Sequence, residues 1–479
     1  MTTTLLFIDD WPIQYKFNID RRLNQPELVR DGILEDDNTE GTWNFPTVWF
    51  DENEGIWKAI YIGVIENRSI TGVSNYYRTK RDETIEMRSQ VLFYAESEDG
   101  IEWRKPTIEN ELSDISRNAV FAGEEFSGHI VDDPEAWIEG GPVYYDPRET
   151  DPQKRVKFIY TLKDGRESKN PQRLATSPDG REWTIESEID LGVGQADALK
   201  SVFYRSETDS YVIGHRTTPL DRRVFFSETD SFSEFDGPEL VISPDPEDPS
   251  LVQFYGMPVF EYGERYVGLL WRFHADPAEI GKKVFGKMDC ALTYSEDGKR
   301  FKRLTHDAFV PVSETGEHGS GCVYVGSMNE TEDEIRFYAG GSKEEHFRNQ
   351  GLTDAALLPY RLRKDGFVSL KPNTSWGEIV TKPLDFDGTS LSINVNAKHG
   401  EVQAQLVDMR GEPIEGYSYD DATEFSGDSL EWTPRWGSKE ITEDVTDGPV
   451  NLAVKLREAE LYSVRGSFEM LAGYDLYDS

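Results

Sequence analysis

The chain has 479 residues, 37% of them hydrophobic and 12% aromatic, and its formal charge is −39 because 90 Asp and Glu outnumber 51 Lys and Arg. This apolar content supports a buried core and excludes general disorder. The charge excludes nucleic-acid binding through clustered Lys and Arg, and it repels an anionic membrane surface. Because the acidic residues are spread along the whole chain, we expect a halophile-type surface whose self-repulsion is screened by molar salt.

The N-terminus and the two cysteines indicate the compartment. Residues 1–10 lack the basic start and apolar stretch of a secretory signal, and no run of about 18 apolar residues occurs that would span a membrane. Cys290 and Cys322 stand in apolar, strand-like runs, so we expect buried thiols rather than a disulfide. We therefore expect a cytoplasmic protein. No His and Asp spacing typical of zinc occurs, so the sequence specifies no metal ligands and predicts no cofactor. It leaves open whether a structural cation lies in the central channel and what the oligomeric state is.

A repeated pair of hairpins organises the chain from about residue 31. The first hairpin of each pair joins two apolar, aromatic runs with the composition of strands. In chain order these runs are 47–51 with 57–63, 142–146 with 156–160, 201–204 with 211–215, 258–261 with 266–271, and 322–325 with 335–339.

The second hairpin carries an Asp-Gly turn motif. Asp-Gly between two apolar runs is a strong hairpin signal because such turns require positive φ. The copies are Ser97–Trp103, Ser177–Trp183, Ser295–Phe301, the looser Ser227–Phe235 and the terminal Arg363–Val368. Five copies, each preceded by a first hairpin, predict five units of four strands.

Four-stranded units that repeat radially form a β-propeller. We therefore expect an all-β chain with a five-bladed β-propeller over residues 1–375, in which the segment 1–30 helps to close the ring. A small β-sandwich is expected over residues 376–479, where short alternating strands are separated by Gly- and Pro-containing turns. The alternative is that the hairpins belong to several unrelated sandwiches.

The mouth of the ring is where we expect the chemistry. In such a ring the entry residues of each first strand, the ends of the second strands and the starts of the third strands converge on one face. Aromatic rings offer stacking surfaces, and arginines bind hydroxyls or carboxylates. The expected substrate-binding residues are Trp43, Asn44, Trp137, Lys163, Arg216, Arg223, Tyr255, Arg272, His274, Glu317 and His318.

With these blades, the chain resembles the five-bladed propeller superfamily of invertases, levansucrases and arabinanases, glycoside hydrolase families 32 and 43 and their relatives. It is most similar to bacterial and haloarchaeal-type members with a C-terminal sandwich. The resemblance covers nearly the whole chain, and the segments that carry it are Phe7–Asp10, Arg21–Pro26, Phe254–Phe260, Phe273–Pro277 and Lys364–Leu370. It implies a hydrolase acting on a terminal sugar in the axial pocket.

The catalytic carboxylates depart from the pattern of that superfamily. Its members place an Asp on blade one, an Asp on blade two and a Glu on blade three. Here the blade-one entry at 42–45 has no carboxylate, blade two has Glu139 and blade three has Asp197. Glycoside hydrolysis ordinarily needs two carboxyl groups. We expect Glu139 and Asp197 to be the acid/base pair and Asp276 a third carboxylate, although Glu139 and Asp276 also suit a strand end and a turn.

Two other functions remain open from the sequence. The missing blade-one Asp favours a non-catalytic carbohydrate-binding or scaffold propeller. A sialidase-like enzyme is the third reading, since the Ser-x-Asp-Gly turns are similar to its aspartate boxes. They lack the residue between Asp and Gly, however, and sialidases have six blades.

Overall fold

The computed structural model describes residues 2–35, 44–70, 80–81, 84–110, 112–113, 116–122, 137–163, 172–191, 201–216, 222–276, 285–346, 354–441, 445 and 448–471. Within these ranges the chain consists of β-strands and loops, and the helical elements are two 3-10 turns, η1 (Arg30–Gly32) and η2 (Pro152–Lys154). No helix in the same ranges has the length and apolarity needed to cross a membrane. The predicted all-β class is confirmed.

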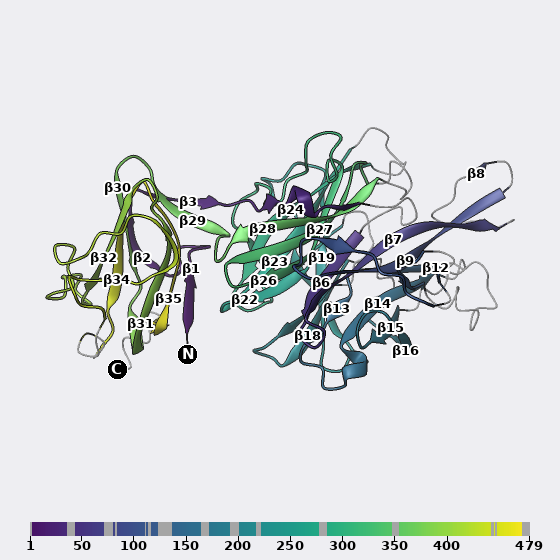
Figure 1. Ribbon diagram of the computed structural model, residues 1–479, viewed down its shortest axis with the longest axis horizontal. Helices are drawn as coiled ribbons and strands as arrows, with labels where there is room; N and C mark the ends of the chain where they lie inside the picture. Colours follow the sequence, from purple (N-terminus) through teal and green to yellow (C-terminus); the bar gives the residue numbers. More distant parts are fainter. Residues whose placement is uncertain are drawn as a thin grey trace.

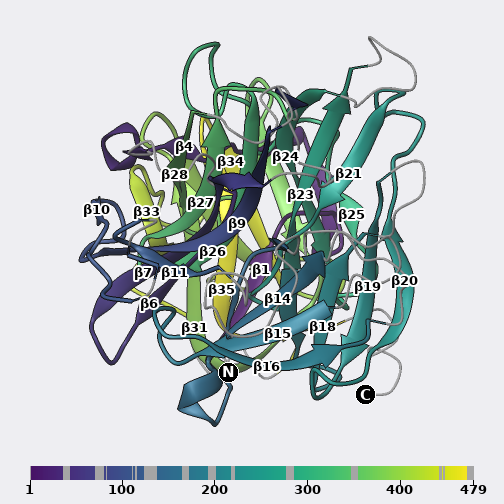
Figure 2. The same cartoon turned by 90° about the vertical axis from the view of Figure 1, so that its right-hand side faces the viewer.

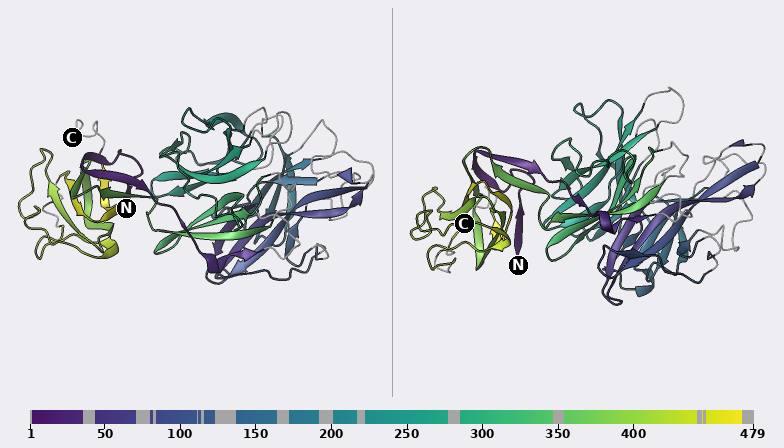
Figure 3. Two further views of the ribbon diagram at one scale, coloured as in Figure 1. Left: turned by 90° about the horizontal axis from the view of Figure 1, so that it is seen from above. Right: turned by 45° about the horizontal axis from the view of Figure 1, so that its top comes forward.

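The strands form two lobes (Figure 1). The larger lobe holds β4 to β28, and the smaller lobe holds the first three strands together with β29 to β35. In both views of Figure 3 the lobes are joined by the segment after β3 and by the segment between β28 and β29.

Three sheets of the larger lobe are each built from consecutive stretches of the chain, with antiparallel neighbours. The first contains β6 (Asn44–Asp51), β7 (Ile56–Ile70), β8 (Lys80–Arg81), β9 (Thr84–Ser97), β10 (Trp103–Arg104) and β11 (Ala119–Phe121). The second contains β12 (Trp137–Gly140), β13 (Tyr144–Tyr145), β14 (Val156–Lys163), β15 (Gln172–Ser177) and β16 (Thr184–Ile189). The third contains β17 (Ser201–Arg205), β18 (Ser210–His215), β19 (Val224–Thr229) and β20 (Asp236–Ile242).

A ten-stranded sheet completes the larger lobe, and one parallel pair, Met288 with Cys322, joins its two halves. One half contains β21 (Val252–Gly256), β22 (Val259–Tyr262), β23 (Arg265–Ala275), β24 (Gly286–Ser295) and β25 (Lys302–Arg303). The other contains β26 (Cys322–Glu330), β27 (Glu334–Ser342), β28 (Ala355–Arg363) and the short strands β4 (Glu27–Leu28) and β5 (Leu34–Glu35). Both cysteines are buried free thiols, as predicted.

These sheets share the walls of one axial cavity of about 230 Å³. Its walls come from residues 47–49, 142–145, 201–202, 258–260 and 326–329, which are early segments of the three sheets and of both halves of the fourth. Seen along the long axis of the molecule, the strands of the larger lobe surround a common centre (Figure 2). Side chains far apart in sequence are therefore delivered to one axis.

The predicted Asp-Gly turns are confirmed at three outer hairpins. Their glycines have the expected positive φ: Gly100 (76°), Gly180 (87°) and Gly298 (62°). In the first turn, Asp99 Oδ1 accepts hydrogen bonds from the backbone N–H groups of Ile101 and Glu102, both at 2.8 Å. Ser97 Oγ accepts from the backbone N–H of Gly100 at 2.9 Å. The serine and the aspartate thus satisfy the turn's own donors, which explains why the motif recurs.

The terminal copy of this motif, around Asp365, has a different role. Asp365 adopts a left-handed φ of 59°, but the strands on either side of it, β28 and β29 (Val368–Pro372), belong to different sheets. The motif here marks the point where the chain leaves the larger lobe.

The N-terminal segment, which we expect to help close the ring, is divided between the two lobes. Only its end, β4, pairs with β28 of the larger lobe. The preceding strands β1 (Thr3–Leu6), β2 (Ile13–Phe17) and β3 (Ile19–Leu23) pair with β35, β30 and β29 of the smaller lobe. Their partners lie more than 300 residues later, so no local pattern shows this pairing.

The smaller lobe consists of two sheets that share one apolar core. One sheet contains β1, β3, β29, β31 (Leu384–Asn396), β33 (Asp428–Trp432) and β35 (Glu460–Met470). The other has the order β2-β30-β34-β32, with β30 (Trp376–Thr381), β32 (Glu401–Val407) and β34 (Asn451–Arg457). Ile379 and Val454 of one sheet and Ile393 and Val464 of the other are all fully buried in the same cluster.

Asp365 ties the two lobes together. Its carboxylate, 1% exposed, accepts hydrogen bonds from Tyr262 Oη of the larger lobe at 2.8 Å and from Ser463 Oγ of the smaller lobe at 2.5 Å. Arg465 of the smaller lobe donates to both oxygens, at 2.6 and 2.9 Å. A further link is the ion pair of Arg265 with Asp9 at 3.2 Å. The junction is a buried contact rather than a free linker, and one apolar cluster also contains residues of both lobes.

Candidate functional site

A cluster of arginine and aromatic side chains lies at the end of the larger lobe away from the smaller one. Arg216, just after β18, places its guanidinium carbon 4.2 Å from the ring centroid of Tyr255 on β21. Arg222 approaches the same ring at 5.5 Å and donates from Nη1 to Gln253 Oε1 at 2.6 Å. Cations over an aromatic face are attracted by its quadrupole, most strongly where water is excluded. Arg216 and Tyr255, 5% and 7% exposed, are held against each other in this way.

His346 connects this pair to the neighbouring strand β26. Its Nε2 lies 3.1 Å from Tyr255 Oη, and its Nδ1 lies 3.2 Å from Tyr324 Oη. In a neutral imidazole one nitrogen donates a hydrogen bond and the other accepts one. The two tyrosine hydroxyls therefore give each ring nitrogen of His346 a hydrogen-bond partner. Phe273 packs edge-on against the imidazole, with centroids 5.4 Å apart. Burial raises the pKa of Tyr324, which therefore stays protonated.

Glu139 supplies a buried carboxylate on β12, the first strand of the second sheet. Its residue is 4% exposed, and it lies opposite Thr161 on β14. The next backbone N–H, that of Gly140, donates to Gln90 Oε1 at 2.8 Å. Glu139 precedes the cavity-lining Pro142 by three residues, as Tyr255 precedes Pro258. Glu139 and Tyr255 thus occupy equivalent positions relative to the cavity in their two repeats.

Arg272 and His274, expected to bind substrate, are engaged by Asp289. Arg272 donates from Nε and Nη2 to the two oxygens of Asp289 at 2.8 and 2.9 Å, and His274 Nε2 lies 3.0 Å from Oδ2. Burial raises the pKa of Asp289, but the hydrogen bonds and charges of His274 and Arg272 outweigh it and lower the pKa overall. The arginine is therefore part of a buried ion pair that braces β23 against β24.

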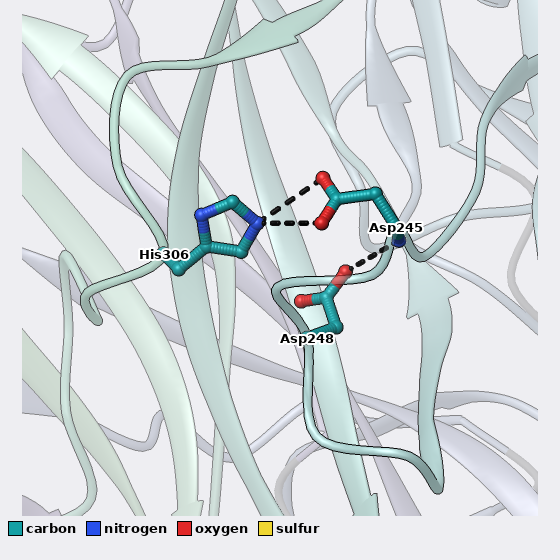
Figure 4. Close-up of side chains that lie close together, drawn as sticks. All are labelled: Asp245, Asp248 and His306. Carbon is teal, nitrogen blue, oxygen red and sulfur yellow. Dashed lines mark hydrogen bonds and ion pairs between the residues drawn. The ribbon is translucent and has the colours of Figure 1, made fainter.

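A second charged cluster, shown in Figure 4, lies near the outer strand β25. His306 Nε2 is 3.0 and 3.1 Å from the two carboxylate oxygens of Asp245, and Asp248 lies beside them. The three residues have the spacing of cation ligands. Arg303 already provides the cation, since it donates to both Asp248 oxygens at 2.6 and 2.8 Å and also to Asp245. Hydrogen bonds from Arg303 help to lower the pKa of Asp248 against the effect of burial.

Glu317, His318 and Asp276 have partners other than Arg216, Tyr255 and His346. Glu317 forms an ion pair with Arg30 at 2.8 Å, and His318 Nε2 lies 2.9 Å from Asp354 Oδ1. Both partners are near β4, β5 and β28, at the outer side of the ten-stranded sheet. Asp276 is exposed, and its backbone N–H donates to Phe285 O at 2.7 Å. Arg223 is half-buried next to Arg222.

Several candidates fall beyond the part of the chain that the structure describes. Trp43 and Asp197 lie outside the described residues. The side chains of Asn44, Trp137 and Lys163 do so too, although their strand positions are given. Asn44 pairs with Ile62, and Trp137 pairs with Lys163.

The sequence interpretation missed His346 and Tyr324. Tyr324 stands in the alternating run 322–325, and its position two residues into a first strand was a usable signal. His346 follows a strand end in a stretch without any motif, and only the folded chain shows that it lies between two tyrosines.

Comparisons with known proteins give distant structural similarity alone. No family model and no curated protein matches the chain. A β-1,2-mannobiose phosphorylase from Listeria innocua, in complex with β-1,2-mannobiose, shares 10% identity over 72% of this chain and 97% of that chain, with a TM-score of 0.47. A putative glycoside hydrolase from Bacteroides ovatus shares 12% over 70% and 96%, with a TM-score of 0.45.

A fructofuranosidase from Schwanniomyces occidentalis complexed with fructosylnystose shares 10% identity over 90% of this chain and 96% of that chain, with a TM-score of 0.42. Similarity at this level leaves the function to be argued from the residues of this chain.

Proposed function

We propose that the larger lobe is a five-bladed β-propeller and the smaller lobe a β-sandwich. The support is that three sheets and the two halves of a fourth each contribute an early segment to the same axial cavity. In this arrangement β4 and β5 close the ring by extending the last blade through β28. The residues around Tyr255 then form the mouth of the propeller.

The function that this mouth supports best is that of a carbohydrate-active enzyme, a glycoside hydrolase acting on a terminal sugar. The observation that carries the proposal is that the buried Glu139 has the same position before its cavity-lining proline as Tyr255 of the Arg216–Tyr255–His346 cluster. A buried carboxylate is suited to acid/base work because its surroundings set its proton affinity. Sugar hydroxyls are recognised by such fixed guanidinium and imidazole groups.

The roles of individual residues follow from their burial. Tyr255 is 7% exposed with Arg216 over its ring, so it fixes that guanidinium instead of stacking on a sugar. Arg216 then holds substrate hydroxyls, and His346 keeps Tyr255 in place. Glu139 and Asp197 act as the acid/base pair. One of them, as the acid, protonates the departing glycosidic oxygen. The other either activates a water molecule or attacks the sugar directly.

Hydrolysis assays with matched variants test this proposal. The full chain, in molar KCl, is offered a panel of aryl-glycosides and oligosaccharides. Glu139→Gln and Asp197→Asn should each abolish the turnover seen with wild type, while Glu261→Gln, an exposed carboxylate in the ion pair with Arg148, should keep it. No turnover on the panel, or full turnover by Glu139→Gln, would overturn the assignment.

A non-catalytic carbohydrate-binding propeller is the second candidate. It is favoured by the blade-one entry, where the strand begins with Asn44 and no acidic residue stands in 42–45. This function predicts that Glu139→Gln and Asp197→Asn bind sugars as tightly as wild type. Calorimetric titration of the same panel separates the two proposals.

A further inference from the structure

We propose that the outer face of the β2-β30-β34-β32 sheet, in the smaller lobe, is a binding surface for a neutral glycan chain, separate from the mouth. This sheet lies on the far side of its lobe. The contacts to the larger lobe are made by the other sheet, through Asn394 on β31, Asp428 on β33 and Arg465 on β35. Figure 1 shows β32 and β34 on the side away from the larger lobe.

The strand register defines which side chains share this face. Residues paired across an antiparallel sheet point to the same side. The inner side is fixed by Ile379, whose partner Val454 is fully buried with it. The outer side therefore carries the alternate positions. Its cross-strand pairs are Tyr15 with Val380, Phe17 with Glu378, Trp376 with Arg457, Gln403 with Lys455, and Gln405 with Ala453.

Aromatic rings are unusually exposed on this face. Phe17 is 60% exposed and Tyr15 51%, on the edge strand β2. They lie two residues apart, which spaces them about 7 Å along the strand. Trp376 on β30 is the diagonal neighbour of Phe17, and its ring is backed by Lys455 at 4.7 Å and Arg457 at 5.3 Å. Exposed apolar groups that gather on one surface mark interaction sites.

Polar groups with fixed positions lie beside these rings. Tyr419 reaches over the sheet from a loop and donates from Oη to Glu378 Oε1 at 2.8 Å. Its backbone N–H donates to Gln405 Oε1 at 3.2 Å, and Gln403 stands next to it, half-buried. A sugar ring has an apolar face and a rim of hydroxyls. Rings beside amides and carboxylates offer partners for both.

The charge of the face selects a neutral partner. Its charged side chains are two acids, Glu378 and Glu401, and two bases, Lys455 and Arg457, and Arg457 is paired with Glu401 at 2.8 Å. The face is thus balanced, whereas the whole chain carries −39. That overall field repels polyanions, and the charged side chains among the rings disfavour the charge-depleted core that protein interfaces have. A neutral glycan is the ligand that fits both observations.

Affinity electrophoresis of the full chain tests this inference without relying on turnover. Native gels contain one neutral polysaccharide at a time, from inulin, arabinan, xylan and mannan, with polygalacturonate as the anionic control. We expect retardation by at least one neutral polymer. The double variant Tyr15→Ala/Phe17→Ala and the single variant Trp376→Ala should weaken it about tenfold or more, as expected for aromatic anchors.

Two controls make the outcome decisive. Phe50→Ala removes an aromatic ring of the larger lobe that is 41% exposed, and it should migrate as wild type. Arg216→Ala removes the guanidinium proposed to hold sugar hydroxyls in the mouth, and it should also be retarded, because the mouth is not needed. The inference would be overturned by unchanged retardation of the double variant or by absence of retardation in every neutral gel. It would also be overturned if light scattering showed dimers of wild type that the double variant does not form.

Discussion

Replacing Asp365 by asparagine removes one negative charge from the junction between the lobes and little else. Asparagine has the same size, and it tolerates the left-handed φ of 59° that this position adopts. What is lost is the partner of Arg465, which donates two hydrogen bonds to the carboxylate. The hydroxyls of Tyr262 and Ser463 also change from charged to neutral acceptors.

The size of the effect follows from the burial of the two partners. Breaking a buried ion pair by removing one side costs about 3–5 kcal/mol, and a hydrogen bond to a charged group contributes about 1.5–3 kcal/mol. The side chain of Asp365 is 1% exposed and that of Arg465 is 21% exposed, so water relieves part of the loss. We expect Asp365→Asn to lower the free energy of unfolding by about 2–3 kcal/mol.

The loss should depend on pH in a defined direction. Burial raises the pKa of Asp365, but the hydrogen bonds and charge of Arg465, followed by the hydrogen bonds of Ser463 and Tyr262, lower it overall. Because the folded pKa lies below the unfolded one, the carboxylate's stabilisation is complete above the unfolded pKa and is lost as the pH falls through the folded pKa. Wild type and Asp365→Asn should therefore differ at neutral pH and converge in acid.

Urea unfolding in molar KCl, followed by tryptophan fluorescence, measures this difference. Asp420→Asn, an exposed aspartate of the smaller lobe, is the matched control and should match wild type. Arg465→Gln completes a double-mutant cycle, in which coupled residues show an interaction energy above about 0.5 kcal/mol. Equal stability of Asp365→Asn and Asp420→Asn, or strictly additive effects with Arg465→Gln, would refute the reasoning.

Three further predictions concern other parts of the molecule. Asp248→Asn should lower the free energy of unfolding in urea by about 3 kcal/mol, because the side chains of Asp248 and Arg303 are 2% and 5% exposed and form a bidentate pair. A decrease below about 1 kcal/mol would contradict this. Tyr255→Phe keeps the ring under Arg216 but removes the hydroxyl bonded to His346. It should therefore lower kcat/KM about five- to tenfold with an unchanged melting temperature, and equal kcat/KM would exclude this contact from the site. Raising KCl from about 0.1 to about 1 M shortens the screening length from about 10 to about 3 Å, so the melting temperature should rise, and a fall would count against a salt-adapted surface.

Local signals in the sequence account for much of the larger lobe. The Asp99 turn was predictable because every group that builds it lies within six residues, and its geometry is confirmed by the φ of Gly100. The same Asp-Gly pair at Asp365 was assigned to a blade, and it lies at the lobe junction instead. What differs there is the strand that follows Asp365. This strand, β29, pairs with β3 of the smaller lobe, and a local pattern cannot show that pairing.

The candidate site was partly predictable for the same reason. Arg216 and Tyr255 were expected at the mouth from their positions in the repeats, and the structure places them in contact. Arg272 was expected to bind substrate, but the register sets it directly opposite Asp289, which takes up its charge. His346 was missed because its neighbours come from three different strands.

The pairing of β1 with β35 has a consequence for how the protein is made. Thr3 and Gly466 are aligned partners, so during synthesis β1 waits for a strand that follows it by more than 400 residues. During synthesis the larger lobe can assemble while the nascent N-terminal strands stay without their neighbours, a situation in which exposed strand edges invite aggregation. Contacts between such distant positions also slow folding. Co-translational chaperone binding is therefore expected to matter most for β1, β2 and β3, until their partners β35, β30 and β29 have been made.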